Sequence, residues 1–144
     1  MANFAYTHAL ALLLKGDIDF ENDDIRVMLI DSTTTADTEK DVSFIGDFST
    51  LGELSGTGYV RKALGTQVVN QDDPNDRGEF DAADIVWTAI NAGTAQAMLI
   101  YKHVTNDADS IPIAYVDTGG FPISTSGGDV TIQWNAQGIL QATN

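Results

Sequence analysis

Few residues in this sequence are of a type that could catalyse a reaction. The only histidines are His8 and His103, and a lone histidine is more often a packing or surface residue than a general base. The sequence has no cysteine, no Gly-x-Ser-x-Gly turn for a serine nucleophile and no glycine-rich phosphate loop. Its 21 carboxylates include no pair that stands apart as an acid and a base. We therefore predict no catalytic residue and no enzyme activity.

Two acidic segments approach the pattern of a calcium-binding loop. In the segment that begins at Asp73, Arg77 occupies the fifth position, where an oxygen ligand is required, and Asp84 replaces the final glutamate. In the segment that begins at Asp17, Asn22 replaces the glycine and Met28 replaces the glutamate. Both segments are more typical of solvated turns. We predict no metal ligands and no cofactor.

Aromatic side chains offer another kind of site, because their flat faces can stack on sugars. The candidates are Trp87, Trp134, Tyr101, Tyr115 and Phe121. The two tryptophans lie in alternating apolar segments, which favours core packing for both. A carbohydrate-binding surface module is therefore an alternative function and not the leading one.

The charge of the chain excludes two classes of partner. There are 21 acidic residues against 7 basic ones, which gives a net charge of −14. Nucleic acids and anionic membranes both require clustered lysine and arginine, so we predict neither as a partner. The acidic residues indicate a solvated and self-repelling surface. Of these residues 17 are aspartate, which favours turns between short strands.

The chain begins with a helical pattern and continues into a long polar segment. Apolar residues at helical spacing predict an amphipathic helix over residues 4–16, and Gly16 is suited to end it. The apolar stripe of that helix would consist of Tyr6, Leu10, Leu13 and Leu14. Residues 31–58 form a long polar connection with scattered apolar anchors, and we expect a helical turn near residues 48–54.

The remainder of the chain is patterned as strands. Residues 25–30 are almost wholly apolar, which predicts a strand covered on both faces. Residues 59–140 contain short alternating segments between Gly-, Asp- and Asn-rich turns, including a first strand over residues 59–69 and a hairpin turn at residues 126–129. We predict one mainly β domain over residues 1–144. Its expected architecture is a jelly-roll-like antiparallel β-sandwich or barrel with one N-terminal α-helix and a long polar connection.

Over nearly its full length the chain resembles a family of small virion structural proteins of tailed bacteriophages. The blocks that carry the resemblance are residues 16–19 (GDID), 25–30 (IRVMLI), 54–59 (LSGTGY), 75–84 (NDRGEFDAAD), 100–102 (IYK), 113–117 (IAYVD) and 127–134 (GGDVTIQW). The resemblance implies a capsid decoration (cement) protein more readily than an enzyme. It also leaves open a tail or head–tail connector protein.

A decoration role implies that the protein is part of the virion, in the head, and that it is assembled in the host cytoplasm. Its partners would be the major capsid protein and copies of itself, for which a homotrimer is one natural arrangement. We expect the N-terminal helix and the connection to act as arms that become ordered on the capsid lattice. The candidate interface residues are Phe4, Tyr6, Phe44, Phe48 and Leu51.

Overall fold

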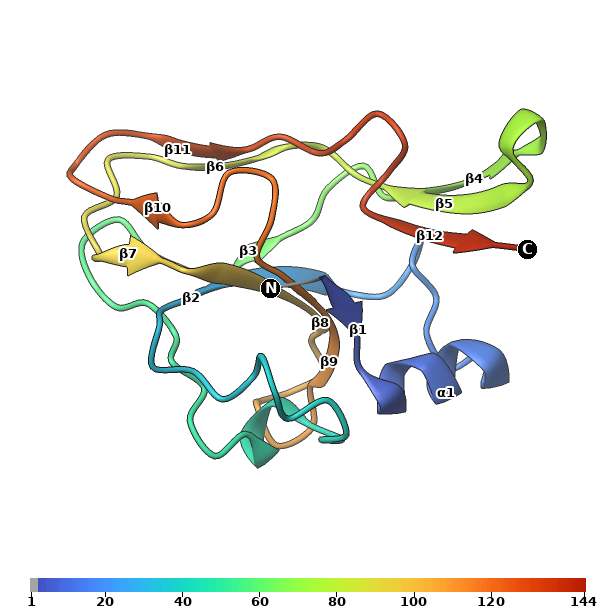
Figure 1. Cartoon of the computed structure of the whole chain (residues 1–144), viewed down its shortest axis with the longest axis horizontal. Helices are drawn as coiled ribbons and strands as arrows, with labels where there is room; N and C mark the ends of the chain where they lie inside the picture. Colours follow the sequence, from blue (N-terminus) through green and yellow to red (C-terminus); the bar gives the residue numbers. More distant parts are fainter. Residues whose placement is uncertain (1–2) are drawn as a thin grey trace.

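A computed structural model describes residues 3–144 as a mainly β chain with one helix near its N-terminus (Figure 1). The elements are β1 (Phe4–Ala5), α1 (Thr7–Lys15), β2 (Ile25–Ile30), β3 (Lys62–Ala63), β4 (Val68–Asp72), β5 (Arg77–Asp81), β6 (Ile85–Trp87), β7 (Thr94–Ala95), β8 (Ala97–Lys102), β9 (Ile111–Val116), β10 (Ile123–Ser124), β11 (Val130–Ile132) and β12 (Leu140–Thr143). Short 3₁₀ turns occur at Ile45–Asp47 and Asp73–Asn75. Every pair of strands is antiparallel. This arrangement confirms the predicted fold class and is compatible with a single domain.

The centre of the molecule is a five-stranded sheet in the order β1-β9-β8-β2-β3. Strands β2 and β8 pair along their whole length, from Ile25 opposite Lys102 to Ile30 opposite Ala97. Five of the six residues of β2 are buried, because both faces of the sheet are covered. A strand in that position must be apolar on both sides, which is why its sequence lacks alternation. The prediction for residues 25–30 is confirmed.

One face of the central sheet packs against a second layer of short sheets. This layer contains the three-stranded sheet β12-β5-β4 and the two-stranded sheet β11-β6, which lie above the central sheet in Figure 1. Leu29 and Ile100 of the central sheet share a core with Phe80, Trp87 and Ile132 of the second layer. In β6 the predicted alternation is confirmed, because Ile85 and Trp87 are buried while Val86 is exposed. The result is a sandwich of one continuous sheet and several short ones.

The opposite face of the central sheet is covered by the connection, residues 31–58. Its buried residues Ala36, Ile45 and Phe48 pack against Ile30 and Leu99 in a second core. The connection is therefore folded onto its own chain, which corrects the expectation of an arm that becomes ordered only on a lattice. Its helical turn lies at Ile45–Asp47, slightly earlier than predicted.

One glycine allows the connection to close tightly on itself. Gly52 has φ of +67°, and a Cβ added there would lie 2.8 Å from the backbone nitrogen of Thr34. The carbonyl of Gly52 accepts a 2.7 Å hydrogen bond from the amide of Asp31, so the two ends of the loop are joined. Only glycine tolerates both the positive φ and the close approach.

The predicted start of the helix is wrong, and the predicted apolar stripe is confirmed only for Tyr6, which is buried, and Leu13, which is partly buried. Helix α1 begins at Thr7, because Phe4 and Ala5 pair with β9 as an edge strand. The buried side of α1 is formed by Ala9, with Leu12 and Leu13 partly buried, whereas Leu10 and Leu14 are 48% and 91% exposed. The predicted end is confirmed, since Gly16 adopts the left-handed conformation and its amide closes the last turn.

Two expectations for the later strands also need correction. Residues 59–69 are not one strand: β3 has two residues, and β4 begins only at Val68. The turn at residues 126–129 does not form a hairpin, because β10 pairs with β7 while β11 pairs with β6. Each partner strand lies far away in the sequence, so local turn chemistry could not reveal it.

We predict that the connection contributes substantially to stability. Replacing Phe48 with alanine should lower the free energy of unfolding by about 3–5 kcal/mol, because it leaves a cavity in the second core. Urea denaturation followed by circular dichroism measures this. The matched control is Leu14→Ala on the exposed side of α1, which should change stability by less than about 0.5 kcal/mol. A Phe48→Ala variant as stable as the parent would contradict the packing of the connection.

Candidate interaction surfaces

Four of the five predicted interface residues belong to the second core or pack against it, and the fifth, Phe44, lies beside His8 of α1. Tyr6 and Phe48 are buried, while Phe4, Phe44 and Leu51 are half-buried. The Phe4 ring stacks on Tyr115 at 5.5 Å, and the Tyr6 ring meets Phe48 edge-on at 5.6 Å. Phe4, Tyr6, Phe48 and Leu51 therefore pack within the chain around the second core. Whether the face above them also meets a partner remains a prediction.

Two buried tyrosines, Tyr6 and Tyr115, belong to this second core. The Tyr6 hydroxyl donates a 2.7 Å hydrogen bond to the carbonyl of Ala36, which ties α1 to the connection. Burial raises the pKa of Tyr6 above its ordinary value, and it raises the pKa of Tyr115 to about 12. Both hydroxyls stay neutral at physiological pH and act as structural groups.

An apolar surface remains uncovered around α1. Leu10 and Leu14 are exposed there, and beside them a groove of about 310 Å³ runs between α1 and the β12-β5-β4 sheet. Leu13, Phe80 and Leu140 are among the apolar side chains that line this groove. We call Leu10, Leu14 and this groove the α1 surface. Contiguous apolar surface of this kind is typical of a site that meets another protein.

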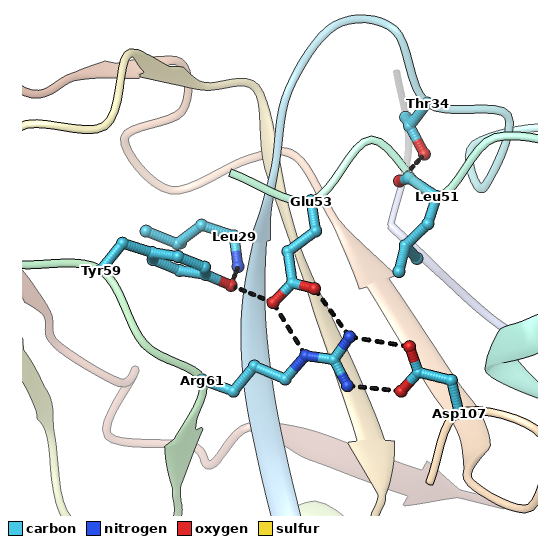
Figure 2. Close-up of polar contacts among 7 residues, drawn as sticks. All are labelled: Leu29, Thr34, Leu51, Glu53, Tyr59, Arg61 and Asp107. Atoms are coloured by element: carbon cyan, nitrogen blue, oxygen red, sulfur yellow. Dashed lines mark hydrogen bonds and ion pairs between the residues drawn. The ribbon is translucent and has the colours of Figure 1, made fainter. Parts of the chain in front are cut away.

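A polar network around Arg61 joins three distant parts of the chain (Figure 2). Its guanidinium donates to both carboxylate oxygens of Glu53, at 2.8 and 2.7 Å, and to both of Asp107, at 2.5 and 3.0 Å. The Tyr59 hydroxyl donates to Glu53 at 2.8 Å and accepts from the amide of Leu29 at 3.1 Å. The network thus covers the edge of β2 where its pairing with β3 has ended.

The charges of this network stabilise one another. The hydrogen bonds that Arg61 donates to Glu53, and then those to Asp107, raise the pKa of Arg61 further above its ordinary value, and the Arg61 guanidinium holds the pKa of Asp107 below its usual range. Burial, followed by the charge of Glu53, raises the pKa of Tyr59. These shifts keep Arg61 and Asp107 charged and Tyr59 neutral, which are their ordinary ionisation states. This arrangement suits a structural clamp better than acid–base catalysis, which needs a group with a pKa near neutrality.

The two histidines pack against aromatic rings. The His8 ring lies edge-on to Phe44 at 5.8 Å, and the His103 ring lies edge-on to Tyr101 at 6.4 Å. His8 belongs to α1 and His103 follows β8, and no hydrogen bond within residues 3–144 joins either ring to Arg61, Glu53 or Asp107.

The two acidic segments that resemble calcium loops are occupied by internal contacts. Arg77 pairs with Asp72 at 3.0 Å and with Glu79 at 2.7 Å, so an arginine supplies positive charge at this turn. In the other segment Asp19 accepts hydrogen bonds from the backbone amides of Glu21 and Asn22. Within residues 3–144 no group of three or more His, Cys, Asp or Glu side chains is arranged to hold a metal ion. No helix in the same range is long and apolar enough to cross a membrane.

The aromatic candidates separate into buried and accessible residues. Trp87, Tyr101 and Tyr115 are at most 1% exposed and belong to the cores. Phe121 and Trp134 are half-buried, and both line a cleft of about 580 Å³ beside β11 and β12. We call this the Trp134 cleft. Trp134 is thus both a packing residue, as predicted, and part of an accessible wall.

Comparisons of the chain with protein-family models, with curated proteins and with solved structures find no match.

We predict that Arg61 contributes more to stability than a surface arginine does, because it holds the polar network together. Arg61→Met should lower the free energy of unfolding by about 2–3 kcal/mol, because it leaves two carboxylates facing each other without a cation. Arg26→Met is the control: Arg26 pairs with Asp24 on a more exposed surface, so its loss should cost less than about 1 kcal/mol. Chemical denaturation of both variants measures the two losses of unfolding free energy. Equal losses of unfolding free energy in the two variants would contradict the structural role assigned to Arg61.

The network should also make stability depend on pH. Since the pKa of Asp107 is lowered by folding, its contribution to stability is fully present above the unfolded value of about 3.9 and is lost as the pH falls through the folded value. The difference in unfolding free energy between the parent and Asp107→Asn should therefore be largest near neutral pH and shrink below about pH 4. In an Arg61→Met background this pH dependence should disappear. A difference that grows on acidification would overturn the assignment.

Proposed function

We propose that this protein is a non-enzymatic structural protein of a bacteriophage particle, most specifically a decoration protein that stabilises the capsid lattice. The observation that carries the proposal is the α1 surface, an apolar face left uncovered between the helix and the β12-β5-β4 sheet. A cement protein needs such a face because it must bury area on a neighbouring protein. The sequence resemblance to small tailed-phage virion proteins supports the same role.

The partner is inferred from the chemistry of the surface. Four of the seven basic side chains are already paired within the chain, so most of the 21 carboxylates face solvent without a cation. A second copy placed directly against the first would meet strong repulsion. A partner with an apolar patch rimmed by lysine or arginine fits better, and we assign that part to the major capsid protein. Copies of this chain would then be held side by side by the shell, with many weak contacts acting together.

A tail or head–tail connector protein would use the same kind of surface, but in far fewer copies. A stained gel of purified particles separates these possibilities by copy number. A decoration protein should be present in numbers comparable with the major capsid protein, whereas a connector should be present in a ring of few copies. Absence from mature heads would overturn the decoration proposal.

The α1 surface gives a direct test of shell binding. Leu14→Asp should weaken binding to purified expanded heads that lack the protein by at least about tenfold, because burial of a leucine contributes roughly 1.5–3 kcal/mol. The measurement is co-sedimentation with the heads at increasing protein concentration. Val104→Asp is the matched control, since Val104 is also an exposed apolar residue, at 49%, and the substitution adds the same charge. Loss of binding by both variants, or by neither, would contradict the assigned surface.

A further inference from the structure

We propose that the Trp134 cleft binds a neutral oligosaccharide. The cleft is formed by segments that are distant in sequence: Asn3, the loop at residues 118–121, and residues 131–141 with the start of β12. Its volume of about 580 Å³ lies within the range of about 300–1,000 Å³ that is typical of ligand sites. This inference concerns a different surface from the α1 surface, with Gln141 as the one lining residue that they share, and it does not depend on shell binding.

The absence of charge in the cleft restricts the class of ligand. None of the described residues that line it is ionisable, although 19% of the whole chain is charged. Residues 118–144 contain a single charged residue, Asp129, and its carboxylate caps the amide of Ala89 instead of facing the cleft. A cationic ligand would find no counter-charge here. An anionic ligand would also be repelled by the net charge of −14.

The polar groups of the cleft are suited to sugar hydroxyls. Its exposed side chains are four amides and two hydroxyls, namely Asn3, Gln133, Asn135, Gln141, Thr118 and Thr131. Each amide both donates and accepts hydrogen bonds, and so does each hydroxyl of a sugar. Asn3 and Thr118 are already joined by a 2.9 Å hydrogen bond, and Gln141 donates to the carbonyl of Gln137 at 2.9 Å. Part of the polar wall is therefore held in place before a ligand arrives.

The aromatic side chains supply the apolar half of such a site. The indole of Trp134 donates to the carbonyl of Ala83 at 3.0 Å, and its backbone amide donates to Asp84 at 3.0 Å. These two bonds fix the ring, which is half-buried in the wall of the cleft together with Phe121. A rigid aromatic face can cover the C–H face of a pyranose at little entropic cost. Mixed neutral polar and aromatic lining distinguishes this cleft from the almost purely apolar groove at α1.

The test uses the full chain and a panel of neutral oligosaccharides: maltopentaose, mannopentaose, galactopentaose and chitopentaose. Binding is measured by isothermal calorimetry and by the change in tryptophan emission. We expect saturable binding of at least one of the four, and no binding of the anionic control pentagalacturonate. Failure of all four to bind, or equal binding of the anionic control, would overturn the proposal.

Variants locate the binding at the cleft. Gln133→Ala and Gln141→Ala together should weaken binding by at least about fivefold through loss of hydrogen bonds, without affecting folding because both side chains are exposed. Gln71→Ala on β4, outside the cleft, is the matched control and should bind as the parent does. Leu14→Asp should also bind as the parent does, which separates this test from that of shell binding. Binding that survives the double variant would place the sugar elsewhere and overturn the assignment.

Discussion

The structure depends on burying both faces of the central sheet. Strands β2 and β8 carry large apolar side chains on both sides, so a single covering layer would leave half of them in water. Each such side chain contributes about 1.5–3 kcal/mol when it is fully buried, so neither face can be left open. The chain satisfies this constraint with two different covers: short antiparallel sheets on one face and the connection on the other. Its role as a cover explains why a segment with so little regular structure is well packed.

The connection could not hold this place through its apolar residues alone. Only a few of its side chains reach the core, and most of its other residues are polar and at least partly exposed. Polar contacts fix the rest: Arg61 joins Glu53 of the connection to Asp107 of the β8–β9 loop, and the amide of Gly46 donates to the carbonyl of Asp107. The chain has few basic residues, so its acidic loops repel one another. An arginine between two carboxylates reduces that repulsion and lets the two loops pack close together. The acidity of the sequence and the position of Arg61 are therefore connected.

Those parts of the fold that depend on local pattern could be predicted from the sequence. The unbroken apolar run of β2 indicated a doubly covered strand, and the alternation in β6 indicated one buried face. The face of α1 could not be read in this way, because leucines at 10, 12, 13 and 14 permit two stripes. Tyr6 determines which stripe faces the core. Its amide donates a hydrogen bond to the carbonyl of Ile113, and its ring lies in the second core. Since that contact joins residues far apart in the chain, Leu10 and Leu14 were assigned to the buried side when they are exposed.

The same limit applies to the candidate sites. Phe48 was recognised as a candidate interface residue, but nothing local shows that it anchors the connection to its own sheet and not to a partner. For the Trp134 cleft the sequence did contain a usable signal, namely the nearly uncharged stretch from residue 118 to the end. What it could not show is that Asn3 closes one wall of that cleft.

The two proposed sites share one structural element, the last strand. Along β12 the side chains of Leu140 and Ala142 line the groove at α1, whereas Gln141 and the preceding Ile139 line the Trp134 cleft. Gln141 lines both the groove and the cleft, because only the single strand β12 separates them. β12 pairs with β5 along one side only, as the outer strand of its sheet. A protein bound in the groove would therefore contact β12, the strand that also forms a wall of the cleft. Because alternate side chains of β12 line the two sites, the groove can face a shell while the cleft stays open to solvent.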